Sequence, residues 1–587
     1  MLLALRTLRG IALSLLLSTP AQSMPGQWSS ALALEGSPAL SADAQLPYVS
    51  ALGQSGGRLQ LGAVGSFDRL NPLMLGGRGP RGMMELVLEP LALTSLNEPD
   101  TLYGLLAESM LLARDGRSIS FRLHPSARFS TGDRVQAEDV RRSYERLMSQ
   151  QASPFWRHYW QGIERAVVVD SRTIRFDFRE ADPGLAALIA GLPVFKAGAW
   201  SADHGLIGSG PYQVSGWSRG AWVEYGRRAD YWGQSVLTRR GQFYFDRVLV
   251  RYARDPSMLR QWAEAGQMDL WIPPDTDRLE RLPRGMQAQA FPNQNPMGMH
   301  GLFFNLRRPA VSDPRVRRAL ILVFDFPWLN RQVFGGRKRQ SLSFFGNTEF
   351  EARGPPSAAE RSLAESLFRQ KGQALPAELL RSLEPSALTP QEARSEAVRL
   401  LEAAGWVWTD GRIHPKGQAE FQLDLALHDA SLAGPLRTWQ AALGQIGIQV
   451  RFIQEDAVAH RRRLMEGQYD LASQHQLASS RPGPEWLARF SSQAAVQGGT
   501  DALVGLEDPV VDALIDRLLS ARQPQERLIA GRLLDRLLRS RELVLGLWHN
   551  ASHRVVLRRG LSWPQQPPDV MDPEVWLLMS AWWGKSL

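Results

Sequence analysis

Two short patterns in the chain could bind a cofactor or a metal ion, and the first is rich in glycine. Gly77–Gly82 has the spacing G-x-G-x-x-G, which in dinucleotide-binding proteins follows a buried strand and opens a helix whose N-terminus meets the pyrophosphate. Here a proline-containing loop precedes the glycines, and Pro80 lacks the N–H that a phosphate would accept. We therefore interpret the segment as a loop leading into a helix.

The second pattern is a pair of histidines, His549 and His553, four residues apart. On a helix this spacing brings two imidazoles to one face, as in zinc sites. The following residues, Arg554–Leu557, are typical of a strand, where side chains four apart do not converge, and no H-E-x-x-H motif occurs. The chain also has no cysteine, which excludes disulfides, thiolate nucleophiles and cysteine-ligated zinc. We expect no metal site and no cofactor.

Short catalytic signatures are missing from the sequence. There is no G-x-S-x-G nucleophile elbow and no Walker A loop, and Ile207–Pro211 has the composition of a Gly-Pro turn. A Ser-His-Asp arrangement would have to assemble from scattered residues. The sequence therefore predicts that the protein is not an enzyme.

The composition is that of a folded protein with several domains. At about 150 residues per domain, 587 residues suggest three or four domains. The hydrophobic content of 44% and the charged content of 22% are ordinary for a globular chain. The net charge of +9 is spread along the chain, and its densest clusters, Arg337–Arg339 and Arg461–Arg463, are short. This pattern argues against nucleic-acid binding.

The N-terminus has the organisation of a secretory signal. Arg6 and Arg9 form a positive region, Ile11–Leu17 an apolar one, and Ala21–Ser23 offers small residues for cleavage. The apolar run is far shorter than the ~20 residues of a spanning helix. We predict a signal peptide over residues 1–23 and secretion to the periplasm. Without a cysteine, the lipid-anchored route is closed.

Alternating and helical patterns predict a mixed α/β protein with several sheets. Strands are expected where apolar residues alternate or run together, at residues 58–62, 118–123, 173–178, 248–252 and 301–305. Thr389–Glu392 is a capping box that starts a helix, and Gly405 ends it. Two more helices are expected after Pro509 and Pro524. The Pro-Gly-rich stretch 349–356 is interpreted as a loop inside a domain.

An ordered set of segments resembles the large solute-binding proteins of peptide-type ABC importers, bacterial extracellular family 5, and in particular the YejA-like branch. Each match is weak alone, but together they follow the family's order from residue 62 to about residue 583. The segments are Gly65–Pro72, Tyr103–Glu108, Phe121–Asp133, Ala137–Val140, Gly208–Tyr212, Asp230–Trp232, Gly266–Asp269, Phe304–Asn305, Asp313–Leu320, Phe324–Phe326, Leu400–Gly405 and Asp535–Leu538.

This resemblance implies a two-lobed periplasmic-binding-protein fold (type II, large peptide-binding class) with a cleft between the lobes. Lobe I would be discontinuous, from residues 24–85, 204–297 and 546–587, with a subdomain inserted at 86–203. Lobe II would span residues 298–545. Crossovers near residues 296–301 and 545–549 would form a hinge, and the lobes would close around a ligand that touches both.

The resemblance also implies which residues face the cleft. Related oligopeptide binders hold the ligand's amine with an acid about nine residues after the pair that matches Tyr469–Asp470, but that place here holds Ser479. We expect Glu485 to be the substitute anchor, although it could instead interact with the N-terminus of its own helix. The predicted ligand-binding set is Phe67, Asp68, Asn71, Asn305, Ser479, Arg481, Glu485, Trp486 and Trp583, and Asp68, Asn305 and Trp583 have equally simple structural interpretations as a turn cap, a strand neighbour and a core residue.

The implied function is capture of oligopeptides or peptide-derived compounds, including microcin C-like conjugates, by a monomer that delivers them to the permease subunits of an ABC importer. Three alternatives stay open. They are a periplasmic hydrolase of peptide or cell-wall fragments, a binding protein for a non-peptide solute, and a sensing subunit that docks on a receptor.

Overall fold

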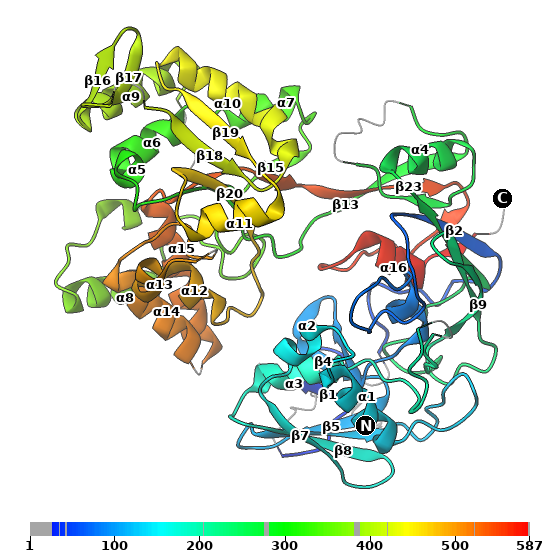
Figure 1. Cartoon of the computed structure of the whole chain (residues 1–587). Helices are drawn as coiled ribbons and strands as arrows, with labels where there is room; N and C mark the ends of the chain where they lie inside the picture. Colours follow the sequence, from blue (N-terminus) through cyan, green and yellow to red (C-terminus); the bar gives the residue numbers. More distant parts are fainter. Residues whose placement is uncertain are drawn as a thin grey trace, which may run out of the picture.

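The computed structural model describes residues 26–584 apart from residues 35, 42–43, 203–204, 275–280, 381–387, 419–420, 500 and 522. The predicted signal peptide lies outside the described residues. Figure 1 shows two bodies joined by long strands, among them β13 (Met286–Pro292) and β23 (Ser552–Arg558). No helix in the described part of the chain combines the length and apolarity that membrane crossing requires.

The first body, here called lobe I, is built around a seven-stranded sheet of order β13-β23-β12-β2-β11-β10-β9. Strands β2 and β11 pair in parallel, with Arg58 opposite Arg247, whereas β23 runs antiparallel to both of its neighbours. Because β23 comes from the end of the chain, lobe I is discontinuous in sequence. Its other elements are η1 (Met83–Val87), β2 (Arg58–Val64), β9 (Tyr212–Ser218), β10 (Trp222–Arg227), β11 (Arg247–Ala253), α4 (Pro256–Glu264), β12 (Leu270–Trp271), α16 (Pro573–Ser580) and the pair β24 (Leu561–Ser562) and β25 (Trp582–Trp583).

Two smaller sheets extend lobe I. One has the order β5-β6-β8-β7 and the other β1-β4-β3, and helices α1–α3 pack with them around one apolar core that includes Phe121, Phe176 and Trp160. The elements are β1 (Ala31–Ala33), β3 (Ala92–Ser95), β4 (Glu98–Gly104), β5 (Ala107–Leu112), β6 (Ser118–Leu123), α1 (Ala137–Met148), α2 (Pro154–Tyr159), β7 (Ile163–Val168), β8 (Thr173–Phe178) and α3 (Pro183–Ala190).

The second body, lobe II, is built around a five-stranded sheet of order β19-β18-β20-β14-β21, covered by helices on both faces. Alternation in β14 explains the two layers, because Leu302 and Phe304 enter one core while Met299 and Phe303 enter the other. The strands are β14 (Met299–Phe304), β18 (Leu423–Leu427), β19 (Val450–Gln454), β20 (Leu471–Gln476) and β21 (Val544–Gly546), with the pairs β15 (Lys338–Gln340) and β22 (Trp548–Asn550), and β16 (Trp406–Thr409) and β17 (Arg412–Pro415).

The helices of lobe II pack on one face of this sheet or on the other. Leu320 of α6, Leu401 of α9 and Trp439 of α10 join the core of Leu302, while α8, α14 and α15 cover the core of Phe303. The helices are α5 (Pro309–Ser312), α6 (Pro314–Leu322), α7 (Phe326–Gln332), α8 (Ala358–Gln370), η2 (Ala377–Leu380), α9 (Pro390–Ala403), η3 (Ala430–Leu432), α10 (Ala433–Gln445), α11 (Ala457–Met465), α12 (Glu485–Phe490), α13 (Ser492–Gln497), α14 (Pro509–Ser520) and α15 (Pro524–Ser540).

Local sequence signals account for several helix starts. An Asp-Pro pair begins α3, α4, α6, α14 and α16, and in each the Asp carboxylate accepts a hydrogen bond from an N–H of the first turn. The capping box at Thr389 is confirmed, since its Oγ1 accepts from the N–H of Glu392 at 3.3 Å and the Glu392 carboxylate accepts from the N–H of Thr389 at 2.8 Å. The strands and helices that the sequence patterns predict are all present in the structure. The segment after Gly82 is a single π-helical turn.

Candidate functional site

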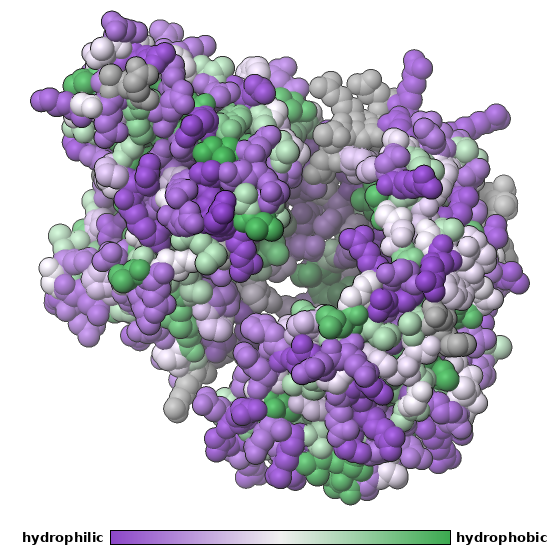
Figure 2. All heavy atoms as spheres, in the orientation of Figure 1, coloured by the Kyte–Doolittle hydropathy of each residue, from purple (hydrophilic) through white to green (hydrophobic). Residues whose placement is uncertain are grey.

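A hollow separates the two lobes on the face shown in Figure 2, and polar side chains cover much of the surface around it. The chain crosses between the lobes over residues 293–298, from β13 to β14, and over residues 547–551, from β21 through β22 to β23. We call these the first and second crossover.

The two crossovers are hydrogen-bonded to one another. The side-chain amide of Asn293 donates to the carbonyl oxygen of Asn550 at 2.9 Å, and its backbone N–H donates to Ala551 at 3.1 Å. Asn295 donates to Met571 of lobe I at 2.8 Å. The crossovers thus form one narrow connection, as a hinge between lobes requires.

A segment of lobe II, residues 343–353, packs against this connection. Asn347 adopts a left-handed φ of 61°, a conformation in which Asn is enriched, and its side chain donates to the carbonyl oxygens of Asn293 at 3.2 Å and Asn295 at 3.0 Å. The backbone N–H of Met297 donates to Gly346 at 2.8 Å. Segment 343–353 therefore fixes the first crossover from the side of lobe II.

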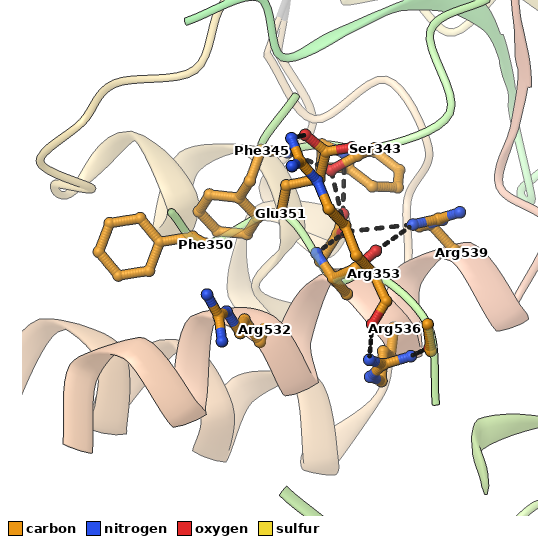
Figure 3. A network of polar contacts seen from close by, with 12 residues as sticks. Ser343, Phe345, Phe350, Glu351, Arg353, Arg532, Arg536 and Arg539 are labelled. Atoms are coloured by element: carbon orange, nitrogen blue, oxygen red, sulfur yellow. Dashed lines mark hydrogen bonds and ion pairs between the residues drawn. The ribbon is translucent and has the colours of Figure 1, made fainter. Parts of the chain in front are cut away.

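Side chains of helix α15 bind segment 343–353 through hydrogen bonds. The fully buried carboxylate of Asp535 accepts from the hydroxyl of Ser343 at 2.9 Å and from the N–H groups of Phe344 at 2.9 Å and Ala352 at 3.0 Å. Figure 3 shows Arg536 and Arg539 of the same helix reaching the segment, where they donate to backbone carbonyls. Burial raises the pKa of Asp535, and these donors oppose that shift.

Segment 343–353 also supports the loop that follows β20. The ring of Phe345 stacks on Trp486 at 4.2 Å with an interplanar angle of 12°. Trp486 is buried and is the second residue of α12, which directly follows loop 477–484. The aromatic stack therefore positions a loop whose residues 479 and 481 were predicted to face the ligand.

Loop 477–484 meets lobe I through an ion pair. Arg481 Nη1 lies 4.0 Å from Oδ1 of Asp100, which belongs to β4, and each side chain is about one-third exposed, at 29% and 30%. Burial raises the pKa of Asp100, and the Arg481 charge opposes it. Burial, and then the charge of Asp100, raise the pKa of Glu349 in segment 343–353. Asp100, Glu349 and Arg481 thus form a charged cluster drawn from both lobes.

The predicted ligand-binding residues of the loop after β2 make most of their contacts within lobe I. Phe67 is buried, with its ring 5.0 Å from that of Tyr252. Asp68 accepts from the N–H of Arg78 at 2.9 Å, which lowers its pKa, so its interpretation as a turn cap fits. Asn71 is buried, and its Oδ1 accepts from the N–H of Leu73 at 3.0 Å. Its Nδ2 has no partner among the described residues.

Three more of the predicted residues make their contacts within their own lobe. Asn305 is fully buried and donates to Gly467 and Tyr469, both at 3.1 Å, so its amide serves the lobe II core. Trp583 donates to the carbonyl oxygen of Arg58 at 3.2 Å, on lobe I. Glu485 accepts from the N–H of Gly483 at 2.9 Å, which is a local turn contact.

Within the predicted ligand-binding set, the residues that are close in sequence between positions 479 and 486 also lie together in the structure. Ser479, Arg481, Glu485 and Trp486 share one loop and helix start, and Ser479 Oγ accepts from the N–H of Arg481 at 3.0 Å. The sequence interpretation missed Asp100, Phe345, Asn347 and Glu349. Only Asn347, in a Gly-Asn pair that favours left-handed φ, carried even a weak local signal.

His549 and His553 are the histidine pair whose spacing in the sequence resembles that of metal ligands. His549 lies on β22 and His553 on β23, so they belong to different strands. Among the residues that the structure describes, no group of three or more His, Asp or Glu side chains is arranged to hold a metal ion.

This architecture defines a class of protein, the two-lobed binding proteins in which strands link the lobes at a hinge. Residues 101–498 match the family model described as bacterial extracellular solute-binding proteins, family 5 Middle. The chain belongs to this family. Its role is that of a substrate-binding component of an ABC importer, and the similarity to relatives named YejA is confirmed.

Three comparisons illustrate the relationship. The chain is 31% identical over 571 residues to a binding protein of Brucella suis biovar 1, covering 92% of each chain. It is 27% identical over 571 residues to the probable peptide-binding protein YejA of Agrobacterium fabrum, covering 92% of this chain and 91% of the relative. The solved unliganded open form of MppA, a murein tripeptide-binding protein, superimposes with a TM-score of 0.64 at 16% identity, covering 92% of this chain and 98% of MppA.

Proposed function

We propose that this protein captures oligopeptides or peptide-derived compounds between its lobes, without changing them chemically, and delivers them to the permease of an ABC importer. The relative YejA of Agrobacterium fabrum is described as a probable peptide-binding protein. The observation that carries the proposal is the charged cluster of Asp100, Glu349 and Arg481, because both lobes contribute to it. A ligand that touches both lobes favours their closure.

The ends of a peptide fit this cluster. With Ser479 where related oligopeptide binders have an acid, the ligand's ammonium group needs another partner. We propose Asp100 and Glu349, since an ammonium between them would offset the burial that raises both pKa values and the charge of Asp100 that adds to the shift of Glu349. Arg481 would then be available to a ligand carboxylate. Main-chain hydrogen bonds would supply the rest, which leaves side-chain specificity broad.

The remaining features of the proposal concern processing and organisation. We propose removal of a signal peptide at residues 1–23, export to the periplasm and action as a monomer. We propose domain boundaries at residues 24–85, 204–297 and 546–587 for lobe I, 86–203 for its insertion, and 298–545 for lobe II. The split of the seven-stranded sheet over distant segments supports a discontinuous lobe I.

A non-peptide solute is the second candidate, and the observation that favours it is Ser479 in place of the amine-binding acid. Peptides with free and with acetylated amines separate the two candidates. If Asp100 and Glu349 hold an ammonium, acetylation weakens binding at least tenfold in calorimetry, and Ser479→Ala leaves the difference intact.

The experiment that tests the proposal uses the purified mature protein, a mixed peptide pool, and mass spectrometry of the species retained after washing. We expect peptides to be retained and recovered intact. Recovery of cleaved peptides would indicate a hydrolase, and recovery of no peptide at all would contradict the proposal. The variant Asp100→Asn with Glu349→Gln serves as a binding-deficient control that keeps side-chain shape.

A further inference from the structure

Four of the ten histidines gather where lobe II meets the crossovers. His300 of β14 and His475 of β20 are opposite each other in the antiparallel pair, with ring centroids 5.2 Å apart. His428, which follows β18, has its ring 6.0 Å from that of His300, and His549 lies on β22 in the second crossover. Such a gathering of ionisable rings at a hinge is not needed for packing.

Two of these rings each hold one crossover. His300 Nδ1 lies 2.7 Å from the carbonyl oxygen of Trp548, and His475 Nε2 lies 2.7 Å from that of Met297. A carbonyl oxygen only accepts, so both ring nitrogens carry a proton and donate it. Since Trp548 is in the second crossover and Met297 in the first, the two histidines fasten both crossovers to the lobe II sheet.

The other two rings are held by serine hydroxyls. His428 Nδ1 lies 2.8 Å from Ser473 Oγ, and His549 Nδ1 lies 3.0 Å from Ser341 Oγ. The charged and titratable groups that act on the four rings come from β15, α11, the end of β18 and segment 343–353; they are Lys338, Arg339, His460, Asp429 and Glu351. The two acids balance the two fixed cations, so once one imidazole has bound a proton, the next proton meets net repulsion.

We propose that His300, His428, His475 and His549 form a proton-sensitive lock on the hinge. With neutral rings the lock fastens both crossovers to lobe II. Proton uptake by His300 and His428 leaves the two donated hydrogen bonds possible but places like charges 6.0 Å apart in a half-buried site. The rings then separate, and both crossovers loosen.

The direction of the pKa shifts agrees with this geometry. Burial, and then the neighbouring imidazoles, lower the pKa of His300 to about 4, and burial with the nearby cations lowers that of His549 to about 4. Burial also lowers the pKa of His428. A histidine pKa below its ordinary value of about 6.5 means that the loosened state binds more protons. The lock is therefore complete above pH 6.5 and is lost as the pH falls toward 4.

Hydrogen exchange of the ligand-free protein tests this lock without reference to any solute. After correction for intrinsic exchange rates, we expect amides of residues 293–298 and 547–551 to lose about 20-fold in protection between pH 7 and pH 5 for each histidine shifted this far. The double variant His300→Asn with His475→Gln keeps neutral donors at the Nδ1 and Nε2 positions and should lose about 20-fold less protection than the parent, because the shifted His300 is gone while His549 remains. The matched control is His158→Asn, which changes an exposed histidine of α2.

Two results would overturn the inference. One is a parallel loss of protection in the parent protein and in the double variant, which would assign the acid response to other groups. The other is an NMR titration in which the His300 resonance, assigned by its absence in His300→Asn, moves with a midpoint near pH 6.5. If the double variant proves too unstable to study, this titration on the parent protein decides alone. Neither result bears on whether peptides bind, so this lock and the proposed function can fail separately.

Discussion

Arg481 of the loop after β20 and Asp100 of β4 form an ion pair of 4.0 Å that joins the two lobes. Both side chains are about one-third exposed, and pairs of this kind contribute only about 0–1 kcal/mol. A weak contact suits the proposed closure of the lobes around a ligand, because a strong one would hold the lobes in one arrangement. We therefore expect the pair to favour the near arrangement of the lobes over the separated one by a small amount.

Removing this pair should shift the lobes apart by a small, measurable amount. For Asp100→Asn or Arg481→Gln we expect at most a fivefold change in the ratio of near to separated lobes, because about 1 kcal/mol corresponds to that factor. The chain has no cysteine, so Glu164→Cys in lobe I and Val458→Cys in lobe II allow specific fluorescent labelling. Single-molecule energy transfer then reports the ratio.

The charge swap Asp100→Arg with Arg481→Asp is the control for that prediction, and it should restore the parent ratio. Salt at 1 M should reduce the difference between parent and single variants, because it screens partly exposed charges. A swap that behaves like the single variants would show that the two side chains do not act as a pair.

At position 347 we expect the stability of the protein to depend on the hydrogen-bonding groups of the side chain more than on its size. Asn347→Gly keeps the left-handed φ of 61° but loses both hydrogen bonds to the first crossover, at a cost of about 1–2 kcal/mol. Asn347→Asp keeps the shape but directs a carboxylate at two carbonyl oxygens, so it should cost more. Urea unfolding measures both, and equal losses would mean that the donated hydrogen bonds do not matter.

Local signals in the sequence account for much of the fold. Strands β6 and β8 alternate over their whole length, and the Asp-Pro pairs fix helix starts through contacts within three residues. The family resemblance supplied what such signals lack, which is the assignment of the chain end to lobe I, where β23 pairs with β12 and β13. No short-range pattern encodes that pairing.

The candidate site was predictable only where it is contiguous. Ser479, Arg481, Glu485 and Trp486 belong to one stretch, so their proximity in space follows from the sequence. Asp100 could not be predicted as a site residue from the sequence, because its pairing with Arg481 arises only where the two lobes meet. Phe67 and Asn305 are polar or aromatic residues at the expected places, yet core packing and backbone hydrogen bonds occupy them.

The buried Asp535 should be required for the stability of lobe II. Asp535→Ala leaves the hydroxyl of Ser343 and the N–H groups of Phe344 and Ala352 without their acceptor, and we expect a loss of about 3–5 kcal/mol. Ser343→Ala, which removes one donor, should cost about 1 kcal/mol. Chemical denaturation compares the two. A loss below 1 kcal/mol for Asp535→Ala would show that segment 343–353 holds its position without α15.

Glu574 of α16 predicts a second pH response, opposite in sign to that of the histidines. Burial raises its pKa to about 7, although Arg81 Nη1 lies 3.0 Å from its Oε1. Because the pKa in the folded protein is above the ordinary value, the stability that the protonated acid contributes is complete below about pH 4.5 and is lost as the pH rises through 7. Glu574→Gln keeps the neutral shape at every pH. We therefore expect this variant to match the parent at pH 4.5 and to exceed it by about 1–3 kcal/mol at pH 8 in urea unfolding, whereas Glu164→Gln on the surface should change neither value. A variant less stable than the parent at pH 8 would mean that the ion pair with Arg81 outweighs the cost of burying the carboxylate.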